Sequence, residues 1–212
     1  MSQSIIELAK SNEREPFSRL REAGCDILVA TADLIPFIPI GSIVAAAAKG
    51  VASVQDYLFC KKIGKFLETI DYSGITDEQI NSFRAEINKI PHFEQKINEY
   101  LLNLISNAES EDKAKIMGFI FVSSVLKDID TNMMLRLCSI VNRAYIYDLQ
   151  SLPMYINKSD ENSIAANNFI SLGLIDNFVG GIWKDSPSYE LNEIGINLFN
   201  ILSKNNWFNH DQ

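Results

Sequence analysis

The chain has 212 residues, of which 47% are hydrophobic and 22% charged, and it contains 10 glycines and 6 prolines. This composition suits one large or two small globular domains and excludes a disordered, collagen-like or polytopic membrane protein. With 27 acidic and 19 basic residues the net charge is −8, which disfavours unaided binding to the phosphate backbone of nucleic acids.

The cysteines and the start of the chain indicate the compartment. Cys25, Cys60 and Cys138 lie far apart in apolar sequence, and an odd number of such cysteines favours reduced thiols over a disulfide framework. The first residues, MSQSIIELAKSNEREP, have neither the basic nor the apolar region of a secretory signal peptide. We therefore expect a cytoplasmic protein, with peripheral attachment to the inner membrane as an alternative.

The first third of the chain is predicted to be helical. A short helix is expected over 4–12, and a second is expected over 15–34. Pro36 and Pro39 must end the second helix, because proline lacks a backbone N–H and clashes with the preceding turn. A new helix is expected from about 41 to 70, so that the segment predicts a pair of helices joined at the prolines.

We predict that residues 27–54 form an apolar helical hairpin. Asp33 is the only charged residue between positions 27 and 48. The two arms of the hairpin are each too short to span a bilayer as single helices. Small residues at four-residue spacing allow close helix contact, and lysines follow where they would meet anionic lipid. Three hypotheses remain open: a packed core hairpin with solvated lysines, membrane insertion or attachment, and self-association. The candidate interaction residues here are Ser42, Ala46, Gly50, Lys61, Lys62 and Lys65.

Three further helices are predicted in the middle of the chain. The preceding helix ends at Tyr72-Ser73-Gly74, and Thr76 with Gln79 forms a capping box that opens the next one. A helix starts at Ser110, with two carboxylates in its first turn, and its residues 116–126 are expected to be buried on most sides. The helix between these two carries its apolar residues at Ile97, Leu101, Leu104 and Ile105.

Asp130 is predicted to cap a helix that continues to Leu149. Arg136 and Arg143 are seven residues apart and share a helix face, and Tyr147 lies four residues beyond Arg143. Such a face binds an anionic ligand or a partner peptide, or it covers the joint to a C-terminal unit. The predicted core face of this helix is formed by Met134, Leu137, Cys138, Val141, Tyr145 and Leu149.

The C-terminal segment changes character after Pro153 and the polar run over 157–160. A helix over 163–172 is expected to end at Gly173, which suits a left-handed helix cap. Two strands are expected to follow, around a turn over 184–187, and a last helix ends the unit. The predicted strands are Ile175 to Trp183 and Ser188 to Leu191, and the predicted last helix is Asn192 to Lys204.

The stretch NNFISLGLIDNFVGGIW…SYELNEIGINLFNIL resembles the end of a winged-helix domain. In that fold a helix ends in LGL, a two-stranded wing follows, and the second strand passes through L-(T/N)-E-(L/I)-G into the closing helix. The resemblance covers about fifty residues and implies a fold, with little about activity. The stretch from Glu111 to Leu152 is similar to small uncharacterised bacterial helical proteins with such a tail, which imply no assigned activity.

A winged helix implies a DNA-binding hypothesis, with residues 163–172 as the recognition helix. That helix contains neither Arg nor Lys, and from Ser159 onward the chain has two basic residues against seven acidic ones. Asn167 and Asn168 have side chains suited to adenine edges, but phosphate anchors are missing. A protein contact or a purely structural wing is therefore favoured for this unit, and Trp183 is a candidate interaction residue.

No catalytic signature is found. His92 and His210 are the only histidines, which leaves no basis for a Ser-His-Asp triad or a histidine-rich metal site. The phosphate-binding glycine motifs, H-E-x-x-H and C-x-x-C are all missing. The sequence thus predicts a protein that is not an enzyme, with no catalytic, cofactor-binding or metal residues.

The predicted architecture is mainly α, with an N-terminal helical bundle over 1–155 and a small winged-helix unit with one β-hairpin over 156–212. The predicted function is that of a non-catalytic bacterial interaction or adaptor protein, acting through the acidic tail and the apolar hairpin. Its partner would be another protein or a second copy of the chain. One alternative is a conditional membrane effector of a stress or phage-defence system, whose hairpin inserts on activation. Another is a DNA-binding transcriptional regulator.

Overall fold

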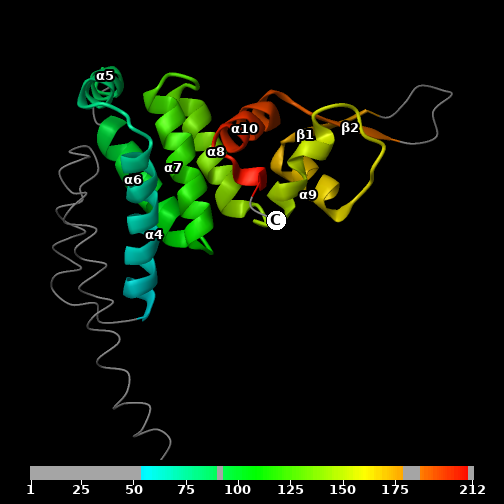
Figure 1. Cartoon of the computed structure of the whole chain (residues 1–212), viewed down its shortest axis with the longest axis horizontal. Helices are drawn as coiled ribbons and strands as arrows, with labels where there is room; N and C mark the ends of the chain where they lie inside the picture. Colours follow the sequence, from blue (N-terminus) through cyan, green and yellow to red (C-terminus); the bar gives the residue numbers. More distant parts are fainter. Residues whose placement is uncertain (1–53, 90–92, 179–186, 210–212) are drawn as a thin grey trace, which may run out of the picture.

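The computed structural model describes residues 54–89, 93–178 and 187–209, and this part of the chain is mainly helical with one two-stranded antiparallel sheet (Figure 1). The elements in chain order are α4 (Val54–Tyr72), α5 (Asp77–Ile87), α6 (Phe93–Asn107), α7 (Glu111–Val125), α8 (Thr131–Arg143), the 3₁₀ helix η1 (Asp148–Tyr155), α9 (Ile164–Leu172), β1 (Ile175–Phe178), β2 (Ser188–Leu191), α10 (Glu193–Lys204) and the 3₁₀ helix η2 (Trp207–Asn209).

Several predictions fall outside these residues. They include the two helices expected before residue 35 and nearly all of the apolar hairpin over 27–54. The ridge of Ser42, Ala46 and Gly50 lies there as well, as do Trp183 and all but the last residue of the predicted turn over 184–187.

Helix α7 lies at the centre of the bundle and packs against α4, α5, α6, α8 and α10 (Figure 1). Most of its residues from Ile116 onward are buried, as the sequence predicts for this helix. Gly118 allows α4 to approach closely, because a Cβ at this position would lie 2.8 Å from the Cβ of Thr69. The bundle core also contains Phe121, whose ring meets the rings of Phe66 and Phe83 edge to face, each with centroids 5.7 Å apart.

The predicted helix starts are confirmed by their caps. Thr76 and Gln79 form a complete capping box, and the side chains of Ser110 and Asp130 accept from the backbone N–H three residues on. Ser163 and Asn192 cap α9 and α10 in the same way. These side chains accept hydrogen bonds from N–H groups that have no partner within the helix. Each helix start can therefore be predicted from the residues close to it in the sequence.

The predicted end of α8 is wrong, because the helix stops at Arg143 and not at Leu149. Ala144 is extended, with φ −65° and ψ 145°. Lys113 donates a hydrogen bond to the carbonyl oxygen of Asn142, which in a longer helix would accept from the residue four positions on. Tyr145 is therefore 58% exposed and does not belong to the core, whereas Leu149 reaches the core from η1.

The C-terminal unit is built around the short sheet. Helix α9 ends at Gly173, whose φ of 72° is left-handed as predicted, and β1 then pairs with β2 in a register that places Ile175 opposite Leu191. Ser159 forms an isolated bridge with Tyr189 of β2, so a third segment lies along the sheet edge. Strand β1 begins at Ile175 as predicted and runs to Phe178, where this stretch of described residues ends. Strand β2 and helix α10 match their predicted positions.

One continuous cluster of buried side chains runs through the bundle and the C-terminal unit. Helix α10 packs against α7 and α8, and the rings of Tyr155 in η1 and Phe169 in α9 meet edge to face at 5.9 Å. The C-terminal unit thus packs on α7 and α8, which brings Leu172 and Ile194 next to the outer face of α8. The division into domains near residue 155 stays a prediction.

Candidate functional site

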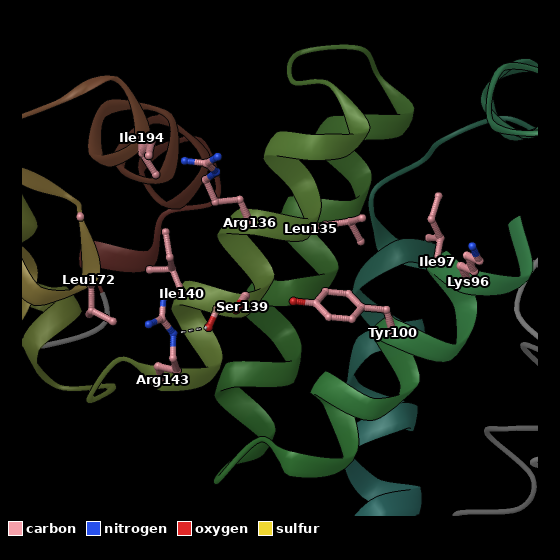
Figure 2. Close-up of a pocket in the computed structure, with 11 residues that line it drawn as sticks. Lys96, Ile97, Tyr100, Leu135, Arg136, Ser139, Ile140, Arg143, Leu172 and Ile194 are labelled. Carbon is pink, nitrogen blue, oxygen red and sulfur yellow. Dashed lines mark hydrogen bonds between the residues drawn. The ribbon is translucent and has the colours of Figure 1, made fainter. Parts of the chain in front are cut away.

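A groove of about 570 Å³ crosses the outer face of α8 (Figure 2). One wall comes from α6, and the opposite wall comes from the end of α9 and the start of α10. We call it the basic groove, because three of its lining side chains are cationic. It is lined by Lys96, Ile97, Tyr100, Leu135, Arg136, Ser139, Ile140, Arg143, Leu172, Gly173 and Ile194.

The amphipathic pattern of α8 positions the two arginines. Its inner face buries Met134, Leu137 and Val141 in the core, which leaves the side chains at 136 and 143 exposed on the opposite side. Seven residues at a rise of about 1.5 Å place their Cα atoms about 10 Å apart along the helix axis. In Figure 2 the Arg136 guanidinium extends toward Ile194, and Nε of Arg143 donates to the Ser139 carbonyl at 3.4 Å.

The groove is positively charged although the protein as a whole is acidic. None of its lining residues is Asp or Glu. The ion pairs between described residues join Lys61 to Glu111, Lys65 to Glu68, Lys113 to Glu109, Lys127 to Glu86 and Lys204 to Asp128, and none involves a cation of the groove. Three cations without a carboxylate partner among the described residues, on a chain of net charge −8, form a site suited to an anion.

The walls of the groove also offer apolar surface and hydroxyl groups. Leu135, Ile140 and Leu172 supply aliphatic contacts, and the Tyr100 ring extends from α6 toward Ser139 (Figure 2). The hydroxyls of Tyr100 and Ser139 make no hydrogen bond to another described residue. A ligand with both charged and uncharged polar groups would therefore find partners here.

Of the sequence-predicted residues, Arg136 and Arg143 are brought together in this groove. The other hypothesis for this face, that it covers the joint to the C-terminal unit, fits the same geometry, since Leu172 and Ile194 come from that unit. Tyr147 does not line the groove, because α8 has ended before it. Its side chain is 72% exposed, and its ring lies 5.3 Å from that of Tyr145.

The predicted lysines are elsewhere, on α4. Lys61 pairs with Glu111 at 2.6 Å, and Lys65 pairs with Glu68 at 2.8 Å. Lys62 donates to the carbonyls of Ser106 and Ala108 at the end of α6, and burial lowers the pKa of its ammonium group. All three lysines therefore have partners within the bundle, and their contact with lipid stays a prediction.

The two asparagines of α9 serve the local structure. Nδ2 of Asn168 donates to the Asp148 carboxylate at 2.6 Å, and this hydrogen bond links α9 to η1. Nδ2 of Asn167 donates to the carbonyl of Ser163 at 3.2 Å. The Nδ2 group of each amide thus has a partner within the chain.

Sequence reasoning missed Lys96 and Tyr100. They are four residues apart and share a face of α6, a signal present in the sequence. Their position beside Arg136 and Arg143 depends on the packing of α6 against α8, which no local pattern states.

Other kinds of site receive no support in the part of the chain that the structure describes. No group of three or more His, Cys, Asp or Glu side chains gathers there in a way that could hold a metal ion. Among the same residues, no helix combines the length and the apolar character needed to cross a membrane. Comparisons with protein-family models, curated proteins and solved structures found no match.

Proposed function

We propose that the chain is a non-catalytic bacterial interaction protein, an adaptor that binds an acidic segment of a partner protein in the basic groove. The observation that carries this proposal is the set of three cations, Lys96, Arg136 and Arg143, which line one groove without any carboxylate. Arginine pairs with a carboxylate through two parallel hydrogen bonds, which gives both energy and orientation.

The composition of the groove supports a protein ligand. Tyrosine and arginine are enriched at the centres of protein interfaces, and aliphatic side chains such as Leu135 and Leu172 exclude water around them. The C-terminal unit, to which we assign a winged-helix fold as part of this proposal, contributes Leu172, Gly173 and Ile194 to the groove. In this proposal the unit forms a docking wall and does not read DNA.

The other two hypotheses have less support. The membrane-effector hypothesis depends on the hairpin over 27–54, which lies outside the described residues. The regulator hypothesis depends on α9, which lacks basic residues and whose Asn168 is engaged by Asp148. Both stay predictions.

The test measures binding of a fluorescent glutamate-rich peptide to the full chain by anisotropy. The double variant Arg136→Gln/Arg143→Gln is compared with Lys89→Gln/Lys204→Gln, which removes the same charge from exposed positions elsewhere. We expect the groove variant to lose about a hundredfold in affinity, since each of the two lost charge-assisted pairs costs about tenfold. Equal losses in the two variants, or no binding by the unaltered protein at low salt, would contradict the proposal.

A further inference from the structure

The basic groove has a polar pattern between its two arginines as well as a charge. Arg136 and Arg143 lie at its ends along α8, about 10 Å apart by helix geometry. Ser139 lies between them on the same helix, and Tyr100 extends toward Ser139 from α6 (Figure 2). The sequence of groups along the groove is thus cation, hydroxyls, cation.

This pattern fits the backbone of an extended peptide. A polyproline II segment rises about 3.1 Å per residue with three residues per turn, so side chains three residues apart share a face at about 9 Å. Its N–H and C=O groups make no internal hydrogen bonds. The unpartnered hydroxyls of Ser139 and Tyr100 would meet them between the two charged contacts.

A helical ligand fits the same charges less well. Its carboxylates would match the arginines at a spacing of seven residues, but its backbone groups are already bonded within the helix. The hydroxyls of Ser139 and Tyr100 would then face a surface with no backbone partner for them. A β-strand fits poorly for another reason, because side chains three residues apart point to opposite faces.

We infer that the basic groove recognises an extended, polyproline II-like segment of a partner protein with two acidic residues three positions apart. Arg136 and Arg143 each take one carboxylate, and Ser139 and Tyr100 contact the backbone between them. Lys96 adds positive charge along the α6 wall. This inference rests on the proposed function and names its ligand class.

The experiment compares short peptides that carry two glutamates each and therefore have equal charge. One has the core Glu-Pro-Pro-Glu, a second spaces the glutamates two apart, and a third spaces them six apart. We expect the first to bind about tenfold tighter than the other two, because only it reaches both arginines at once. The single variants Arg136→Gln and Arg143→Gln should each reduce its affinity to that of the other peptides.

Two further variants test the backbone contacts. Ser139→Ala and Tyr100→Phe keep every charge and remove one hydroxyl each, so both should weaken the Glu-Pro-Pro-Glu peptide by about threefold to tenfold. The affinities of the two peptides with other glutamate spacings should be unchanged in these variants. Unchanged affinity of Glu-Pro-Pro-Glu in both variants would overturn the assigned role of the hydroxyls.

Each remaining outcome overturns the inference in a distinguishable way. Equal binding of all three peptides, abolished by Arg136→Gln/Arg143→Gln, would leave the proposed function standing but remove the spacing rule. Tighter binding of a helical peptide with glutamates seven apart would replace the extended ligand by a helix. Equally tight binding of inorganic phosphate would replace the peptide by a small anion, and failure of every acidic peptide would end the proposed function as well.

Discussion

The ammonium group of Lys113, on a side chain that is 1% exposed, donates a 2.9 Å hydrogen bond to the backbone carbonyl of Asn142 in the last turn of α8. Its second partner is the Glu109 carboxylate at 2.9 Å, which is 71% exposed. The first bond joins the start of α7 to the end of α8, next to Arg143. Lys113 thereby binds the last turn of α8 one residue before Arg143 of the basic groove.

Replacing Lys113 by Met should destabilise the fold although the size of the side chain is kept. The Asn142 carbonyl would lose a charged donor, and a hydrogen bond to a charged group contributes about 2 kcal/mol. Glu109→Gln should cost less than about 1 kcal/mol, because its exposed carboxylate is screened by solvent. Urea denaturation of both variants checks this, and a larger loss for Glu109→Gln than for Lys113→Met would contradict the assignment.

Gly195 should not tolerate a side chain. A Cβ there would overlap the carbonyl oxygen of Leu174, so α10 would have to move away from the β1 end of the unit. We expect Gly195→Ala to lower the free energy of unfolding by about 3 kcal/mol, the upper part of the range for overpacked sites. Ser203→Ala, on the exposed side of α10, should change it by less than about 0.5 kcal/mol.

Gly118→Ala tests the contact between α4 and α7. Alanine favours a helix over glycine by about 1 kcal/mol, but its Cβ would lie 2.8 Å from Cβ of Thr69 and 3.1 Å from the Phe66 carbonyl oxygen. We expect a net loss of about 2 kcal/mol, because two backbones must separate. Asn132→Ala on the exposed face of α8 serves as the control, and a stabilised Gly118→Ala variant would show that the helices can part freely.

The arginines of the basic groove should be dispensable for folding. Arg136 forms no ion pair with a described residue, and Arg143 bonds only to the carbonyl of Ser139 within its own helix. Arg136→Gln/Arg143→Gln should therefore keep the thermal midpoint and change the unfolding free energy by less than about 0.5 kcal/mol. A loss of several kcal/mol would assign the pair to the joint between bundle and C-terminal unit.

Cys138 should make stability fall at alkaline pH. Burial raises the pKa of its thiol well above the ordinary value of 9.0, so the folded state keeps the proton while the unfolded state releases it. Stability from this group is complete below pH 9 and declines above it by about 1.4 kcal/mol per pH unit. The free energy of unfolding of Cys138→Ala, relative to that of the unaltered protein, should therefore rise by about 1 kcal/mol from pH 8 to pH 10. For Leu137→Ala, which removes no titrating group, the same difference should not change between these pH values.

The features that the sequence predicted well are those made by neighbouring residues. The capping box of Thr76 and Gln79, the caps at Ser110 and Asp130, and the left-handed Gly173 each depend on bonds or dihedral angles within four residues. The same holds for the shared face of Arg136 and Arg143, because helical periodicity alone places them there.

Tertiary structure decided what those local patterns leave open. In the last turn of α8 the Asn142 carbonyl accepts a hydrogen bond from Lys113, which lies 29 positions away, and no pattern around Arg143 predicts this contact. The basic groove needs Lys96 and Tyr100 from α6 beside α8, together with Leu172 from the C-terminal unit. The sequence by itself therefore determined the helix starts and the cationic face of α8, since their hydrogen bonds and spacing are local. Packing between distant segments decided that this face became a walled groove, because only the folded chain brings those side chains together.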